Sequence, residues 1–150
     1  MSSNVAGLQQ SMIDILEAAR AAGPAADGAP KVVKAYEGEL GQLNQVRSLP
    51  IVLVDVASQF DIEAQGAAGS IYHGDYQPEI IVFAENRSSG KQTVSELAKV
   101  ADWTISALRN KLVTIDGIPV ELHRRIRGRM ITDIKPASCI LTCIIQTSEE

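Results

Sequence analysis

The sequence predicts an α+β fold in which two helices pack on one face of a mainly antiparallel or mixed sheet. Two segments place apolar residues at three- and four-residue steps, which is the spacing of an amphipathic helix, and five others are rich in apolar and β-branched residues. In chain order these segments read α-β-β-β-α-β-β. Runs of strands separated by single helices are typical of a sheet whose helices gather on one face.

The first part of the chain is predicted to form one helix and three strands. The helix covers residues 5–22, and the strands cover residues 31–36, 51–62 and 78–85. Because residues 51–57 are apolar at almost every position, we expect that strand to lie in the middle of the sheet. Residues 64–77 contain three glycines and few residues that could pack, which predicts a long mobile loop.

A second helix is predicted over residues 93–113. Thr93 and Glu96 have the spacing of a capping box at its start. The apolar positions expected to face the sheet are Leu97, Ala101, Ile105, Leu108 and Leu112. Two further strands are predicted after this helix, over residues 119–130 and 137–147.

Length and composition indicate a single domain over residues 1–150 with an aliphatic core. Hydrophobic residues make up 45% of the chain but aromatic residues only 4%, so Val, Ile, Leu and Ala must fill most of the interior. The net charge of −4 favours solubility and gives no general attraction to nucleic acid. No apolar run approaches the roughly 20 residues needed to span a bilayer.

The two cysteines are expected to be reduced core residues. Cys139 and Cys143 lie in one β-branched run. On a strand they would share a face, but their Cα atoms would be about 13 Å apart, which is beyond the reach of a disulfide.

The sequence shows no signature of catalysis or of cofactor or metal binding. Asp55 follows an apolar strand and residues 89–91 have part of a phosphate-binding loop, but Glu85 and Gln92 stand where that loop needs a glycine and a hydroxyl. The few histidines and cysteines do not have metal-ligand spacing, and no nucleophile-and-base signature occurs. We therefore expect no catalytic, cofactor-binding or metal-binding residues.

Potentially positive residues alternate near the end of the chain. They are His123, Arg125, Arg127 and Arg129, and on one strand all of them would lie on one face. Three interpretations are open for this basic row: a solvated face of an edge strand, an intersubunit surface that meets carboxylates, or a nucleic-acid contact.

The order of segments resembles the tail-terminator (tail-completion) proteins of Mu-like, contractile-tailed bacteriophages. The likeness is carried by a leading amphipathic helix, a short strand ending at Tyr36 to Leu40, a central strand entered through Leu49 and Pro50, a strand followed by a long helix, and a closing pair of strands. It covers almost the whole chain and consists of patterns of small and apolar residues. The basic row has no counterpart among these features.

The resemblance implies a tail-terminator-like fold and a structural subunit without catalytic residues. Such a subunit forms a six-fold homo-oligomeric ring at the end of the tail tube and sheath, stops their polymerisation and presents a surface to the head-connector protein. It would belong to the virion, in the tail or neck, and assemble in the cytoplasm of the bacterial host. The alternative functions are a neck or head-completion adaptor and a small enzyme of unrecognised type. No membrane partner is expected, and direct nucleic-acid binding is disfavoured.

Overall fold

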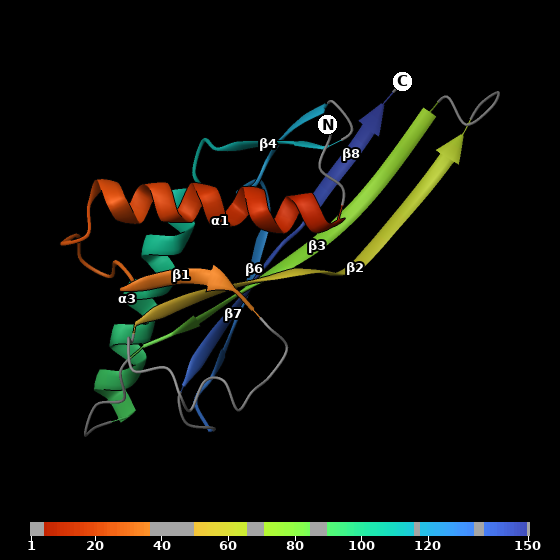
Figure 1. Ribbon diagram of the computed structural model, residues 1–150. Coiled ribbons are helices and arrows are strands. Elements are labelled where there is room, and N and C mark those ends of the chain that lie inside the picture. Colours follow the sequence, from red (N-terminus) through yellow and green to blue (C-terminus); the bar gives the residue numbers. More distant parts are fainter. Residues whose placement is uncertain are drawn as a thin grey trace.

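The computed structural model describes residues 5–36, 50–65, 71–84, 90–115, 118–133 and 137–149. Its helices are α1 (Val5–Ala22) and α3 (Gly90–Leu108). Its strands are β1 (Val32–Ala35), β2 (Ile51–Gln65), β3 (Ile71–Phe83), β4 (Leu112–Ile115), β5 (Ile118–Glu121), β6 (Ile126–Ile131), β7 (Ser138–Cys143) and β8 (Ile145–Glu149), as shown in Figure 1. This combination of two helices with a mixed sheet confirms the predicted α+β class.

The main sheet is built around β3. The strand order is β1-β2-β3-β7-β6, and β8 pairs with the outer part of β3. The β1–β2 pair is parallel, and the pairs of β3 with β2, β7 and β8 and of β6 with β7 are antiparallel. The predicted inner position of β2 is confirmed for Ile51–Val54, which have neighbours on both sides. Strands β4 and β5 form a separate two-stranded sheet.

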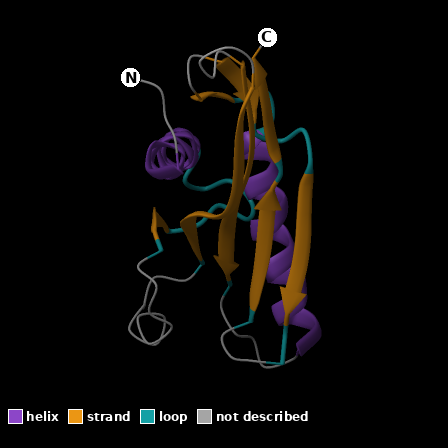
Figure 2. Cartoon of the chain, turned by 90° about the vertical axis from the view of Figure 1, so that its right-hand side faces the viewer, coloured by secondary structure: helices purple, strands orange, loops and turns teal. Residues whose placement is uncertain are grey.

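Both helices pack against the same face of this sheet. Alternation along the strands places Val52, Val82 and Cys139 in one cross-strand row of that face. The helical residues buried against it include Leu8, Met12 and Leu16 of α1 and Leu97, Val100 and Leu108 of α3. The two helices cover this face in different directions, since α1 is seen end-on in Figure 2 while α3 runs beside the strands. On the opposite face, Ile51, Leu53 and Phe83 form a smaller buried cluster.

Gly28 allows the connection between α1 and β1 to lie directly on α3. It has a positive φ of 81°, which glycine adopts without strain. A Cβ atom here would come within 2.3 Å of the carbonyl oxygen of Lys99, so the close approach also requires the missing side chain. The neighbouring Asp27 carboxylate lies 3.9 Å from the Lys99 ammonium, although this exposed pair adds little stability.

The helix predicted over residues 93–113 begins earlier and ends earlier than expected. Because α3 starts at Gly90, Thr93 lies inside the helix and the predicted capping box is wrong. At the other end, Asn110 has φ 60°, a left-handed conformation that ends helices. The chain then turns into β4, and the Leu112 side chain is 57% exposed instead of facing the sheet. Of the other predicted core positions, Leu97, Ala101 and Leu108 are buried and Ile105 packs against the core.

The predicted mobile loop over residues 64–77 is wrong for most of its length. Strand β2 continues to Gln65 and β3 begins at Ile71, so the two strands form a long hairpin. Their register is continuous from Gln59↔Gln77 to Gln65↔Ile71. Residues 66–70 lie outside the described part of the chain. Glycine content misled the prediction, because β3 accommodates Gly74 between two hydrogen-bonded neighbours, β2 and β8.

The strand predicted over residues 137–147 is interrupted once, at Ile144. The segments β7 and β8 keep one register against β3, since Glu79 pairs with Thr142 and Tyr76 with Ile145. In that register Pro78 stands opposite Cys143, and proline has no N–H to donate to a neighbouring strand. The interruption therefore marks a missing hydrogen bond and not a change of direction.

The opposite exposures of two leucines give a test of where α3 ends. Leu108→Ala should lower the free energy of unfolding by about 2 to 5 kcal/mol, because it leaves a cavity in the core. Leu112→Ala is the matched control and should change it by no more than about 0.5 kcal/mol, as expected for an exposed side chain. Urea denaturation of the two variants measures both values. Equal losses would contradict the turn at Asn110.

The cysteines are free and buried, which confirms their predicted place in the core. Burial raises the pKa of the Cys143 thiol from 9.0 to about 12. Burial also raises the pKa of Cys139, and a hydrogen bond with the Arg129 backbone partly offsets this. Both thiols are therefore protonated and unreactive near neutral pH.

The raised pKa of Cys143 predicts a loss of stability in alkaline solution. Its contribution is complete below pH 9.0 and disappears as the pH rises toward about 12, because the unfolded chain releases a proton that the native state retains. Within this window unfolding becomes easier by up to about 1.4 kcal/mol per pH unit. Urea denaturation between about pH 9 and 11 should show a shallower loss for Cys143→Ala than for the wild type. Identical slopes would mean that the thiol does not contribute.

Candidate functional site

The segment containing the basic row is folded as two strands joined by a turn. The single strand predicted over residues 119–130 is wrong, because β5 ends at Glu121 and β6 begins at Ile126. Two contacts hold the turn against the end of α3. The N–H of Leu122 donates to the carbonyl of Lys111 at 3.3 Å, and the N–H of Asn110 donates to Nδ1 of His123 at 3.3 Å. Since the Leu122 side chain is fully buried, the chain must bend here before β6 can start.

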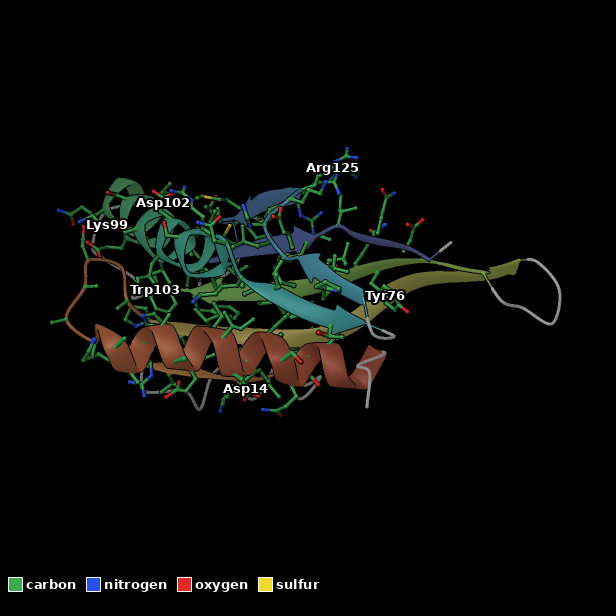
Figure 3. All side chains as sticks on the ribbon, turned by 90° about the horizontal axis from the view of Figure 1, so that it is seen from above. Asp14, Tyr76, Lys99, Asp102, Trp103 and Arg125 are labelled. Atoms are coloured by element: carbon green, nitrogen blue, oxygen red, sulfur yellow. The ribbon has the colours of Figure 1, made fainter. Side chains whose placement is uncertain are left out.

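The structure separates the four predicted residues into two pairs. His123 and Arg125 lie in the turn, where His123 is half-buried and Arg125 is exposed. Figure 3 shows the Arg125 side chain pointing away from the sheet. Arg127 and Arg129 lie on β6 opposite Thr142 and Ile140, so they share the sheet face that the helices leave uncovered. The predicted alternation therefore holds on β6 for Arg127 and Arg129, while His123 and Arg125 lie outside the strand.

Strand β6 is an edge of the main sheet, and half of its backbone groups face outward. It pairs only with β7 among the described strands. The N–H of Ile144 donates to the carbonyl of Arg125 at 2.9 Å, and antiparallel pairs with and without such bonds alternate. In this register Arg127 and Arg129 direct their backbone groups toward β7. Ile126, Gly128 and Met130 direct theirs away from the sheet, where a further strand could bind.

The edge is strongly basic and has no internal counter-charge. Residues 122–131 contain four arginines, Arg124, Arg125, Arg127 and Arg129, and no aspartate or glutamate. All four are exposed, and no ion pair between described residues involves them. Met130 beside them is 41% exposed. We name residues 122–131 the basic edge. Sequence alternation could locate its arginines, but not the outward-facing backbone.

In the part of the chain that the structure describes, no group of three or more His, Cys, Asp and Glu residues is arranged to hold a metal ion. Burial raises the pKa values of the two cysteine thiols. On α1, the hydrogen bond between Glu17 and Arg20 lowers the pKa of the carboxyl and raises that of the guanidinium. Gly90 begins α3, and Ser89 beside it lies outside the described residues. Neither described helix has the length and hydropathy to cross a bilayer.

The chemistry that this arrangement supports is binding. Exposed guanidinium groups attract carboxylates or phosphates, and outward N–H and C=O groups accept another strand. Comparison with models of known protein families gives no match, and comparison with curated proteins gives none either.

Proposed function

We propose that the chain is a structural subunit that caps the tail of a Mu-like, contractile-tailed bacteriophage. In this role it forms a ring, as a hexamer, at the end of the tail tube and sheath, ends their polymerisation and makes the joint to the head connector. It acts in the virion after assembly in the host cytoplasm, and needs no cofactor. The proposal includes no catalytic step.

The order of elements supports this role. The amphipathic helix α1, the short strand β1, the inner strand β2, the strand β3 followed by the long helix α3, and the closing strands are present in the order on which the resemblance depends. The segment from Tyr36 to Pro50, which also belongs to the resemblance, is mostly outside the described residues.

The observation that carries the ring assembly in this proposal is the basic edge, which pairs only with β7 among the described strands. An exposed strand edge is a template for association with another chain, and charged side chains along it discourage pairing with any strand that lacks the opposite charge. Here the edge is six residues long over β6, and its arginines form no ion pair with any other described residue. Surface charges at an interface raise association rates and select partners more than they add affinity. A ring subunit must join identical copies in a single orientation and strand register, and charges at the interface can select that arrangement.

Reversing charge at the basic edge should weaken assembly without unfolding the subunit. Arg125→Glu combined with Arg127→Glu changes exposed residues, so the urea midpoint should stay close to that of the wild type. The assembled fraction, measured by analytical ultracentrifugation, should fall and become less sensitive to salt.

The matched control reverses the same number of charges elsewhere. Arg109→Glu with Lys111→Glu alters two exposed cations after α3 that form no ion pair with described residues, and should leave assembly unchanged. If the edge variant assembles like this control at low and high salt, the edge is a solvated surface.

Deletion of the gene from the phage or prophage that carries it tests the role itself. Without a terminator, tube and sheath polymerisation has no stop, so electron microscopy should show tails of uncontrolled length and detached heads. A neck or head-completion adaptor would instead leave tails of normal length without heads. Infectious particles with normal tails would remove both proposals.

A further inference from the structure

We infer that copies of this chain join head to tail, with the basic edge of one copy paired to the outer part of β2 in the next. The main sheet would then continue from subunit to subunit. This inference rests on the proposed function as a ring subunit and identifies the surface that receives the basic edge.

The first observation is a second unpaired edge at the other side of the sheet. Strand β1 pairs with β2 only from Ile51 to Val54, and the N–H of Tyr36 extends this contact to the carbonyl of Val54. From there to Gln65, β2 pairs with β3 alone among the described strands. Figure 1 shows this part of the β2–β3 hairpin reaching beyond the rest of the sheet, with β8 beside β3. We name it the hairpin arm.

The second observation is that the two edges have opposite charge. Beyond Ala57 and Pro78, the strands of the hairpin arm contain three carboxylate residues, Asp61 and Glu63 on β2 and Asp75 on β3, and no lysine or arginine. The basic edge contains four arginines and no carboxylate. The hairpin arm and the basic edge therefore carry opposite charge.

The third observation is that the charges have the same spacing. Asp61 and Glu63 are two residues apart on β2, and Arg127 and Arg129 are two residues apart on β6. Residues at this spacing lie on one face of a strand, about 7 Å apart. One register between neighbouring strands can therefore match both pairs at once.

The hairpin arm also places like charges against each other. Asp61 and Asp75 occupy directly opposed positions of β2 and β3, and Asp75 is exposed. Directly opposed like charges destabilise a strand pair. An arginine from a neighbouring strand would offset this repulsion.

These charges exclude the symmetric alternatives. Pairing of two β6 edges would bring arginines against arginines, and pairing of two hairpin arms would bring carboxylates against carboxylates. The pairing of unlike edges is heterologous: each copy binds one neighbour through its basic edge and the other neighbour through its hairpin arm. Such contacts form a ring when the rotations between successive copies add up to a full turn.

A charge exchange tests this pairing. The basic-to-acidic variant carries Arg127→Glu and Arg129→Glu, and the acidic-to-basic variant carries Asp61→Lys and Glu63→Lys. Each alone should associate at least about tenfold more weakly than the wild type, because like charges then face each other. Mixed together, they should assemble in strict alternation, since each supplies the edge that the other needs. A chain with all four substitutions should assemble by itself. Native mass spectrometry resolves these species, and circular dichroism with urea denaturation verifies that each variant is folded.

Other outcomes overturn the pairing. The pairing is wrong if both variants assemble as the wild type does. It is wrong if neither the mixture nor the fourfold variant regains assembly. It is also wrong if the wild type stays monomeric at high concentration and low salt. It is also wrong if the basic-to-acidic variant assembles normally but loses binding to duplex DNA, which would make the basic edge a nucleic-acid contact. The gene deletion tests tail capping through tail length, and the charge exchange tests which strand edges pair. Failure of one proposal can therefore be told apart from failure of the other.

Discussion

Pro78 is the residue on which the geometry of the sheet depends. It lies inside β3, the strand paired along both sides, although proline is usually confined to edges, strand starts and bulges. The strands on both sides are irregular beside it. Strand β2 shifts register on either side of Ala57, the residue that pairs with Pro78. On the other side, the strand opposite β3 is interrupted at Ile144. Bulges bend a strand and increase its twist, so the hairpin arm leaves the sheet at this point.

The same region determines where the basic edge begins. The N–H of Ile144 bonds to the carbonyl of Arg125, which starts the β6–β7 ladder. Hydrogen-bonded and non-hydrogen-bonded pairs alternate along β6 from that bond, so the backbone N–H and C=O groups of Gly128 and Met130 point away from β7. At Gly128 a Cβ would lie 3.3 Å from the Leu141 side chain, so β6 packs closely on β7. The free edge is therefore a consequence of pairing in the middle of the sheet.

Much of the fold could be predicted from hydrophobic periodicity alone. The spacing of Leu8, Met12 and Leu16 predicted α1, and their complete burial agrees with it. The errors arose where local signals compete with tertiary contacts. The sequence predicts a strand that starts at Pro78 and a loop before it, but pairing with β2 and β8 makes residues 71–77 part of β3. Leu112 continues the helical spacing of α3, but the left-handed Asn110 ends the helix before it.

The candidate site was predictable in composition but not in arrangement. Alternation identified Arg127 and Arg129 as neighbours on one face, which the register of β6 confirms. It could not reveal that burial of Leu122 bends the chain at His123 and Arg125. The acidic positions that we propose as the partner of the basic edge were also hidden, because they lie on neighbouring strands only if the hairpin arm is a pair of strands. The central claim is that the basic edge of one copy pairs with the hairpin arm of the next.

Amide hydrogen exchange along β6 tests this claim most directly. In the monomer the amides of Arg127 and Arg129 should exchange slowly because they face β7, while those of Gly128 and Met130 face outward and should exchange fast. In the assembled form the Gly128 and Met130 amides should become protected, since they would bond to β2 of the next copy. If their exchange is equally fast in both forms, no strand is added at this edge and the claim is wrong.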